Sequence, residues 1–293
     1  MATPLEIAHG PTNALDWIAS AITALLSQIG RDPRDLAAIG IGLPGPVEHD
    51  TGKPSNPPIM PGWDKFDVPH YVQRTFDVPV LVDNDVNIMA LGERAASWPG
   101  ADNLIFLKVA TGIGAGIISS GVLQRGDQGI AGDVGHIRVT SGAGVMCRCG
   151  NEGCLEAIAG GPAIAAQLIA DGPSADSTAG VVALVRSGDL AAIQAVRQAG
   201  KDIGEVLNMC VSIINPSVIV IGGSMAEVSE HLIAGIREVV YARSQPLATQ
   251  NLTIAPSRTG PEAAILGASL MAADFVLSPN NINALNSRAN SIA

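Results

Sequence analysis

The spacing of apolar residues near the start of the chain predicts an amphipathic helix from Thr12 to Gly30. Apolar side chains recur there every three or four residues, which places them on one face of a helix. These side chains are Leu15, Ile18, Ile22, Leu25, Leu26 and Ile29. Thr12 or Asn13 can cap the start of the helix, and Gly30 can take the left-handed conformation that ends it.

Short apolar runs along the rest of the chain predict buried strands. They cover 37–43, 78–82, 104–110, 116–119, 217–221 and 252–255. One predicted helix follows the 78–82 strand and runs through 95. Further predicted helices cover about 161–170, 177–187, 189–214, 228–243 and 261–276. Strands that alternate with helices predict a largely parallel, layered α/β sheet. The Pro- and Gly-rich segment 51–64 predicts a loop, and the Asn- and Ser-rich tail from Ser278 onward predicts a frayed end.

Composition narrows the class of protein. Hydrophobic residues make up 47% of the 293 residues and charged residues 15%, which is typical of a compact globular chain. The net charge of −10 argues against a nucleic-acid surface on these residues, so any DNA contact is expected from a domain absent from this chain. The sequence has neither an apolar run long enough to span a membrane nor a secretory signal at MATPLEIAHG, so we expect a cytoplasmic protein with no membrane partner.

Three cysteines and one histidine have the spacing of a metal site: His136-x10-Cys147-x-Cys149-x4-Cys154. Three thiolates and an imidazole form the closed tetrahedral shell of structural zinc sites. The alternative is three buried free thiols beside an unrelated histidine. We favour zinc, because such crowding of thiols is hard to explain without a metal. The fourth cysteine, Cys210, stands alone in an apolar helix and is predicted to be a small core residue.

Two further segments carry candidate chemistry. Asn84 and Asp85 stand at the carboxyl end of an apolar strand, where open α/β sheets place their ligands. Alternatively, Asp83 or Asp85 caps the helix that follows. The glycine-rich stretch 111–115 between two strands can bring backbone amides close to phosphate oxygens, although such a stretch is also an ordinary hairpin turn.

Six motifs, taken in order, resemble the ROK family of repressors and sugar kinases: GLPGPVEHDTG, PPIMPGWD, VDNDVN, ATGIGAG, GDVGH and CRCGNEGCLEAIAGG. The resemblance covers nearly the whole chain. It implies the actin-like ATPase (ribonuclease H-like) α/β fold with two lobes, a zinc-binding loop, and a cleft between the lobes for a sugar and a nucleotide. The PPIMPGWD loop looks more like transcriptional regulators of actinobacterial type than like stand-alone glucokinases.

The resemblance also implies roles for individual residues. Asp85 matches the general base that takes a proton from the attacking sugar hydroxyl. The positions that match sugar-binding residues are Gly45, Asn56, Asn84, Asp85, Asp133, His136 and Glu156. The positions that match nucleotide-binding residues are Thr111, Gly112, Gly114, Gly116, Gly222 and Gly223. Gly222 and Gly223 can also be a plain turn from a strand to a helix.

This chain departs from the family pattern in two places. The family usually has Glu-x-Gly-His where this chain has Asp133-Val134-Gly135-His136, and the shorter Asp reaches less far toward a sugar. Kinases of the family open with a hairpin carrying Asp-x-Gly-Gly-Thr, which residues 1–12 do not contain, so we expect the first hairpin to be missing. A truncated chain, a mis-assigned start or a gene fragment would each account for it.

The expected domains are an incomplete N-terminal lobe (1–95), a C-terminal lobe with the zinc loop, phosphate loop and adenosine-type stretch (96–277), and the tail (278–293). Our leading hypothesis is the sugar-sensing core of a ROK transcriptional regulator of carbohydrate metabolism, with weak or no kinase activity in this form. One alternative is an ATP- and Mg-dependent hexose or N-acyl-hexosamine kinase. Another is a zinc-stabilised pseudoenzyme without a ligand. The resemblance further implies a homodimer or higher homo-oligomer.

Overall fold

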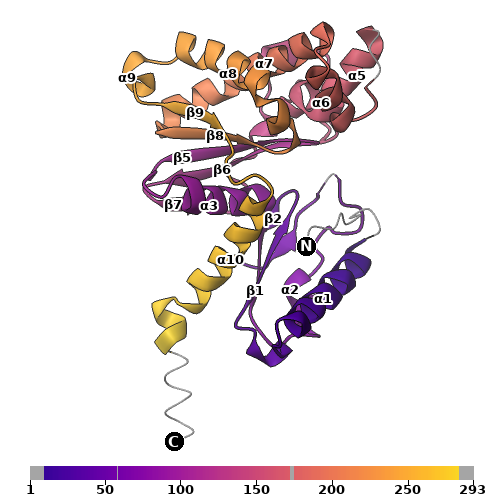
Figure 1. Cartoon of the computed structure of the whole chain (residues 1–293), viewed down its shortest axis with the longest axis vertical. Coiled ribbons are helices and arrows are strands. Elements are labelled where there is room, and N and C mark those ends of the chain that lie inside the picture. The colour runs from indigo at the N-terminus through magenta and orange to yellow at the C-terminus, as the bar shows by residue number, and fades with distance from the viewer. Residues whose placement is uncertain (1–9, 58, 172–174, 284–293) are drawn as a thin grey trace, which may run out of the picture. The chain divides into compact units, whose positions relative to one another are not determined.

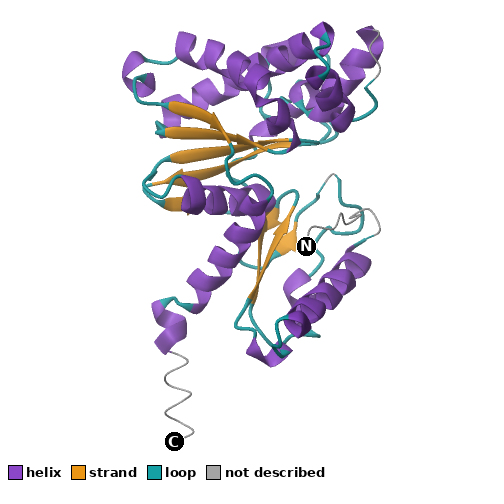
Figure 2. Ribbon diagram, in the orientation of Figure 1, coloured by secondary structure: helices purple, strands orange, loops and turns teal. Residues whose placement is uncertain are grey.

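The computed structural model describes residues 10–57, 59–171 and 175–283. The chain divides into two compact units, which Figures 1 and 2 show as ribbons. Unit 1 comprises the described parts of Met1–Gly92, Gly126–Ile130 and Ala263–Ala293, and unit 2 comprises Glu93–Arg125 and Ala131–Glu262. The sequence-based boundaries had placed Gly126–Ile130 and the last helix in the second lobe. Each unit is described by itself below.

Unit 1 is built on a pair of parallel strands, β1 (Ile39–Leu43) and β4 (Val80–Asn84). The register pairs Ile41 with Val82 and Leu43 with Asn84, so both strands end at the same edge. The other elements of this unit are α1 (Pro11–Gln28), η2 (Pro33–Asp35), β2 (Val47–Glu48), β3 (Lys53–Pro54), α2 (Val68–Gln73), most of α3 (Asp85–Ser97) and α10 (Glu262–Val276).

Helix α1 confirms the predicted helix and corrects its details. It begins at Pro11 with Gly10 as the N-cap residue, so the predicted cap at Thr12 or Asn13 is wrong. Proline suits the first helical position because the N–H that it lacks has no partner within the helix there. Gly30 adopts the predicted left-handed conformation, with φ of 67°. Of the predicted apolar face, Leu15 and Leu26 are buried, whereas Leu25 and Ile29 are exposed.

The Pro- and Gly-rich segment 51–64 is mostly a loop, as predicted, but its residues Lys53–Pro54 pair with β2 as an antiparallel strand. The loop then sends Met60 and Trp63 into the core of unit 1, where each is 1% exposed. A loop that carries core side chains of this size is held in place by their burial, which stabilises it by about 1.5–3 kcal/mol per side chain. This loop is therefore an integral part of unit 1.

Unit 2 contains a five-stranded mixed sheet in the order β7-β6-β5-β8-β9. Its strands are β5 (Leu104–Val109), β6 (Ile113–Ser119), β7 (Val122–Gln124), β8 (Val218–Gly222) and β9 (Thr253–Pro256). The pairs β5–β8 and β8–β9 are parallel, whereas β5–β6 and β6–β7 are antiparallel. The prediction of a largely parallel sheet is thus right for β5, β8 and β9 and wrong for the β5–β6 and β6–β7 hairpins. Every residue of β8 is buried, which explains its unbroken apolar sequence.

Four described helices of unit 2 match the predicted segments closely, and two four-residue helices, the first and the last of the unit, were not predicted. The described helices are α4 (Glu156–Ala159), α5 (Gly161–Asp171), α6 (Thr178–Arg186), α7 (Leu190–Ile214), α8 (Ser229–Arg243) and α9 (Pro246–Thr249), with 3-10 turns η3 (Val134–His136), η4 (Thr140–Gly142) and η5 (Ser224–Val228). Helices α7 and α8 lie on one face of the sheet (Figure 1). They can approach closely because Gly200 has no side chain. A Cβ there would collide with the carbonyl oxygen of Leu232. Cys210 on α7 is buried, as predicted for a core residue.

No single helix in the described ranges is long and apolar enough to span a membrane. Helices α6 and α7 pass that test only as a pair, with a bend of 118° between them. The apolar faces of both helices belong to the core of unit 2. Of the predicted frayed tail, 284–293 lies outside the described residues, and 279–283 forms a further helical turn.

Candidate metal centre and ligand-binding residues

The structure brings together the four residues of the predicted metal site. The ligand atoms of His136, Cys147, Cys149 and Cys154 all lie within 4.8 Å of one another. Nδ1 of His136 is 3.6 Å from Sγ of Cys147, and Sγ of Cys149 is 3.6 Å from Sγ of Cys154. A tetrahedral zinc ion with Zn–S bonds of about 2.3 Å and a Zn–N bond of about 2.0 Å separates its ligand atoms by about 3.5–3.8 Å. The cluster can therefore hold a metal ion of that size.

Two tight turns bring the cysteines together. The N–H of Gly150 donates to the carbonyl of Cys147, and the N–H of Cys147 donates to the carbonyl of Asn151. Gly150 (φ 92°) and Gly153 (φ 83°) both adopt backbone conformations that residues with a Cβ rarely take. These glycines explain how three sulfurs from eight consecutive residues can point at one position.

The thiols of Cys149 and Cys154 differ in their pKa. The backbone N–H of Asn151 lowers the pKa of the Cys149 thiol to about 7, because that donor stabilises the thiolate. Burial raises the pKa of Cys154 to about 12, and the neighbouring sulfurs add to this increase. A bound cation would counteract both the burial and the repulsion, since metal ligation requires the thiolate form. The donor set thus fits a soft divalent metal.

A hydrogen bond anchors the metal-binding segment (136–154) to α7. Oγ of Ser141 donates to Oδ1 of Asp202 on α7 (2.8 Å), and Nε2 of Gln198 donates to the same oxygen (3.2 Å). Burial raises the pKa of Asp202 above its usual value. Since α7 is the longest helix of the described chain, this contact ties the segment to a rigid element.

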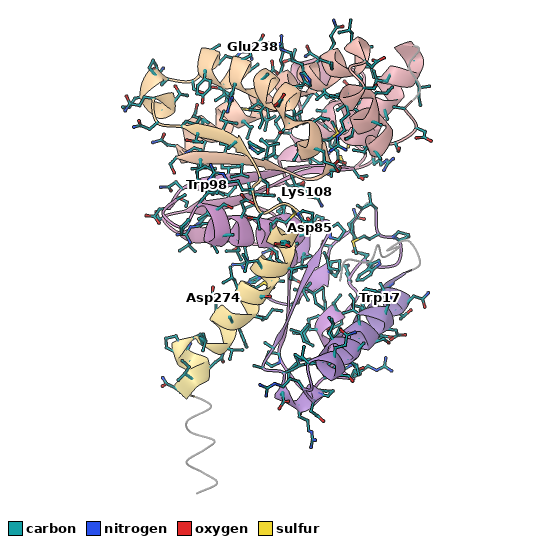
Figure 3. All side chains as sticks on the ribbon, viewed as in Figure 1. Trp17, Asp85, Trp98, Lys108, Glu238 and Asp274 are labelled. Atoms are coloured by element: carbon teal, nitrogen blue, oxygen red, sulfur yellow. The ribbon has the colours of Figure 1, made fainter. Side chains whose placement is uncertain are left out.

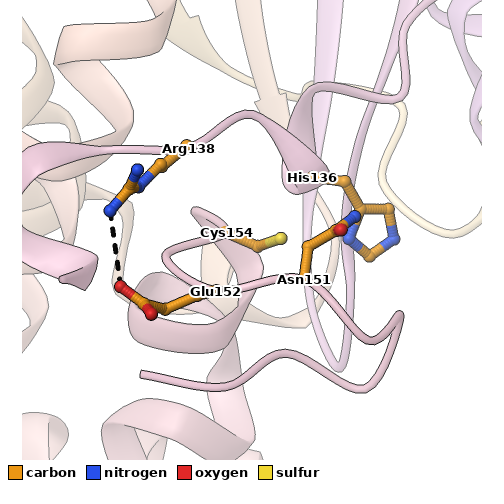
Figure 4. Close-up of a pocket in the computed structure, with 5 residues that line it drawn as sticks. All are labelled: His136, Arg138, Asn151, Glu152 and Cys154. Atoms are coloured by element: carbon orange, nitrogen blue, oxygen red, sulfur yellow. Dashed lines mark hydrogen bonds and ion pairs between the residues drawn. The ribbon is translucent and has the colours of Figure 1, made fainter. Parts of the chain in front are cut away.

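A cavity of about 350 Å³ opens beside the cluster. Figure 4 shows its lining: His136, Arg138, Asn151, Glu152 and Cys154. Arg138 and Glu152 form an ion pair across it (3.3 Å), and Glu152 also accepts from the N–H of Gly144 (2.9 Å). Glu152 therefore links the cysteine turn to Arg138 and Gly144, which precede it in the chain.

His136 directs its two nitrogens differently. Nδ1 faces the sulfur of Cys147, whereas Nε2 lies 3.9 Å from Oδ1 of Asp133. Metal-binding histidines commonly face a carboxylate with their second nitrogen, which orients the ring. Asp133 itself is exposed, as is consistent with a residue that can also meet a ligand.

The carboxyl end of β4 carries a hydrogen-bonded network. Nδ2 of Asn84 donates to the carbonyl of Gly45 (2.6 Å), and Oδ1 of Asn84 accepts from the N–H of Val86 (2.9 Å). Asn84 thus links the chain after β1 to the start of α3. Asn84 thereby also satisfies a backbone N–H in the first turn of α3. Asp85, which is labelled in Figure 3, is the first residue of α3.

Asp83 supports this strand end from inside. It is 1% exposed, and its Oδ1 accepts from the N–H of Asn84 (2.7 Å) and from Nδ2 of Asn87 (2.9 Å). Its Oδ2 lies 3.8 Å from Nδ1 of His49. Sequence reasoning did not include Asn87 or His49, although the Asp-Asn-Asp-x-Asn run was a visible signal for Asn87.

Asn56 and Gly45 occupy unusual backbone positions in unit 1. Asn56 has φ of 44°, and its N–H donates to Oδ1 of Asp64 in the PPIMPGWD loop (2.7 Å). Gly45 has φ of 105° and packs against Pro57. Left-handed conformations in non-glycine residues are uncommon and often occur at functional positions.

Glu156 is the first residue of α4 and binds the turn between β5 and β6. Its Oε2 accepts from the N–H of Ile113 (3.0 Å), and a Cβ on Gly112 would lie 2.8 Å from the same oxygen. A side chain at 112 would therefore displace the carboxylate from this position. The N–H of Gly161 also donates to the carbonyl of Ala110 (2.8 Å). Helix α4 and its successor thus hold both sides of this turn.

The predicted nucleotide-binding residues lie in the β5–β6 hairpin and at the end of β8. Thr111 and Gly112 form the turn itself, whereas Gly114 lies within β6, so the loop is shorter than the predicted 111–115; Gly116 lies in β6, as predicted. The strand starts earlier because Ile113 pairs with Val109. Gly222 is the last residue of β8, and Gly223 has φ of 85° before η5. The alternative of a strand-to-helix turn therefore describes their geometry well.

The predicted sugar-binding residues fall in both units. Gly45, Asn56, Asn84 and Asp85 belong to unit 1, and Asp133, His136 and Glu156 belong to unit 2. Within each unit the residues are held by short-range hydrogen bonds and turns. Their joint action on one sugar stays a prediction.

These features define an α/β protein of the actin-like ATPase class with a Cys/His cluster. The chain belongs to the ROK family, whose model matches residues 6–275. A glucokinase of Halalkalibacterium halodurans is 30% identical, over 88% of this chain and 84% of that protein. A xylose repressor of Caldicellulosiruptor bescii is also 30% identical, over 94% of this chain and 72% of that protein.

Solved structures show the same two kinds of relative. A ROK family transcriptional regulator, a homolog of the E. coli MLC protein, matches with a TM-score of 0.78 at 27% identity, over 88% of this chain and 67% of that chain. A ROK hexokinase from Thermus thermophilus matches with a TM-score of 0.76 at 30% identity, over 94% and 90%. The family therefore includes both regulators and kinases that are similar to this chain.

Proposed function

We propose that this chain is the sugar-binding sensor of a ROK transcriptional regulator of carbohydrate metabolism. The observation that carries the proposal is the network at the end of β4, where Asn84 links Gly45 to the start of α3 and so positions Asp85. Carboxylate and amide side chains that are fixed at a strand end are suited to bind neighbouring sugar hydroxyls. The sugar-binding set is Gly45, Asn56, Asn84, Asp85, Asp133, His136 and Glu156.

The regulator is favoured over the kinase by the PPIMPGWD loop and by Asp133. The loop buries Met60 and Trp63, and its Asp64 accepts a hydrogen bond from the N–H of Asn56. A regulator-like sequence feature therefore orients a predicted sugar-binding residue. Asp133 is shorter than the usual glutamate and lies beside His136. Sugar binding would change the arrangement of the two lobes and thereby act on an attached DNA-binding domain.

The metal in this proposal is a structural zinc ion held by His136, Cys147, Cys149 and Cys154. Bound zinc would supply folding energy to the cysteine turns, and the closed ligand set leaves no position for substrate. Hydrogen bonds of Ser141, Asp202 and Glu152 hold the cysteine segment in place. The segment in turn positions Glu156, a predicted sugar-binding residue two positions after Cys154.

The alternative function is an ATP- and Mg-dependent hexose or N-acyl-hexosamine kinase. It is favoured by the hydrogen bond between Glu156 and the N–H of Ile113, which connects a predicted sugar-binding residue to the turn at Thr111 and Gly112. In this reaction Asp85 would accept the proton of the attacking sugar hydroxyl, and the turn amides would face the phosphates. Gly222 and Gly223 would contact the adenosine.

Binding and turnover measured together separate the two functions. Glucose, xylose and N-acetylglucosamine are titrated by calorimetry, and the same sugars are then assayed with Mg-ATP in a coupled kinase assay. A sensor binds one of the sugars with a phosphorylation rate at background. Turnover that disappears in Asp85→Asn but persists in Asp77→Asn, an exposed aspartate of the same unit, would make the kinase the better description.

A further inference from the structure

The three sulfurs of the metal cluster differ in their access to solvent. Cys147 and Cys154 are buried, whereas Cys149 is exposed. The side-chain amide of Asn151, 3.5 Å from the Cys149 sulfur, is exposed as well. A small oxidant in solution can therefore reach the Cys149 sulfur first.

Cys149 also has a partner sulfur within short reach. Its Sγ lies 3.6 Å from that of Cys154, and a disulfide of about 2.05 Å requires the two sulfurs to approach by about 1.5 Å. The intervening turn can accommodate this movement. Gly150 follows Cys149 directly, and a Cβ built on it would meet no atom within 4 Å.

We infer that Cys149 is an oxidation site at which a peroxide converts the Cys149–Cys154 pair to a disulfide and releases the metal. This inference rests on the proposed metal site. The Cys149 sulfur attacks one peroxide oxygen, so that an S–O bond forms, the O–O bond breaks and the leaving hydroxide is protonated to water. The Cys154 sulfur then attacks the resulting sulfenic acid, an S–S bond forms and a second water leaves.

The step is balanced by the peroxide alone. Two thiolates lose two electrons in total, and one hydrogen peroxide with two protons becomes two waters. His136 and Cys147 are left as the remaining protein ligands, and two ligands cannot close the four-coordinate shell of a structural zinc site. Metal release follows from this loss of ligands.

The oxidised pair would also act on the neighbouring turn. Cys154 pairs with Arg138 in an isolated bridge, and Glu156, two residues later, holds the N–H of Ile113. A shift of Cys154 toward Cys149 therefore reaches the turn at Gly112. Oxidation would therefore loosen the turn that carries the predicted nucleotide-binding residues Thr111 and Gly112, without modifying either residue.

The test treats the zinc-loaded full chain with hydrogen peroxide and follows released zinc with a chromogenic chelator. Metal content is measured first by elemental analysis. Remaining thiols are then alkylated, and peptides are mapped by mass spectrometry. We expect one zinc released per chain, a Cys149–Cys154 disulfide, and recovery of bound zinc after a dithiol reductant and added zinc.

Two variants control the experiment. Cys210→Ser, in the core of α7, should release zinc at the wild-type rate, and Cys149→Ser should release it about tenfold more slowly. If Cys149→Ser does not hold zinc, the peptide map of the wild-type chain decides. A disulfide that uses Cys147 or Cys210, or zinc that stays bound while free glutathione is oxidised, would overturn the inference. Absence of metal before peroxide would instead overturn the proposed metal site.

Discussion

At the scale of single residues, buried and half-buried carboxylates hold the candidate sites in shape. Asp83 and Asp202 each accept two hydrogen bonds. Glu156 accepts one, from the N–H of Ile113, and lies close to Gly112. An acceptor of this kind is costly to remove, because the donors that it served lose their partner within the protein. These three carboxylates can therefore be tested individually.

Replacing Glu156 with alanine should destabilise unit 2 by about 1–2 kcal/mol, because the N–H of Ile113 loses its acceptor. Urea unfolding monitored by circular dichroism measures this change. Glu156→Gln keeps an oxygen acceptor and should lose less than half as much. Equal losses in the two variants would show that the hydrogen bond to Ile113 is not what the side chain contributes.

Asp202 gives a pH-dependent prediction. Its pKa is raised by burial in the folded state, so the folded chain binds this proton more tightly than the unfolded chain does. Stability from this group is thus present at low pH and is lost as the pH rises from about 3.9, the unfolded value, through the folded pKa.

Asp202→Asn removes this titration and keeps an oxygen for Ser141 and Gln198. The difference in unfolding free energy between the variant and the wild type should therefore shift in favour of the variant as the pH rises through that window. Urea unfolding at a series of pH values measures it. A difference that is constant with pH would contradict the assignment.

At the scale of elements, most of the fold was predictable and the contacts between elements were not. Helix α7 was predicted at 189–214 and observed at Leu190–Ile214, because its apolar period is long and its cap, Asp189, is a strong signal. The start of β6 was missed, since pairing of Ile113 with Val109 depends on a hairpin whose glycines resemble a loop. The cysteine spacing predicted the cluster of four ligands, whereas the contact of Ser141 with Asp202 joins residues 61 apart and left no local pattern.

The packing of α7 on α8 is sensitive to any side chain at Gly200. Gly200→Ala would push a Cβ into the carbonyl of Leu232, so the variant should lose about 1–3 kcal/mol of stability from overpacking. Thermal and urea unfolding measure the loss. Gly100→Ala is the matched control, because a Cβ there has no atom within 4 Å and the backbone is not left-handed. Similar stability of the two variants would contradict the close approach of the helices.

The cysteine turns should depend on bound metal. A strong chelator is expected to lower the melting temperature of the chain, because the binding energy of a structural metal is part of its folding energy. Cys154→Ser should have the same effect without the chelator, and Cys210→Ser should retain the response to it. Scanning calorimetry with elemental analysis measures this. An unchanged melting curve in chelator, together with a metal-free protein, would exclude the proposed zinc site.

At the scale of the whole molecule, the proposed function depends on residues from both units. Unit 1 supplies the end of β4 with Asp85, and unit 2 supplies the metal cluster, Glu156 and the turn at Gly112. The proposed function requires both sets to meet the same ligand. We also propose a homodimer or higher homo-oligomer, which light scattering tests independently of the sugar.

The most direct test of the central claim is a calorimetric titration of the zinc-loaded chain with glucose, xylose and N-acetylglucosamine. We predict binding of at least one of these sugars at one site per chain, abolished in Asp85→Asn and unchanged in Asp77→Asn. No heat of binding with any of the three sugars, or equal binding by the wild type and Asp85→Asn, would contradict the account.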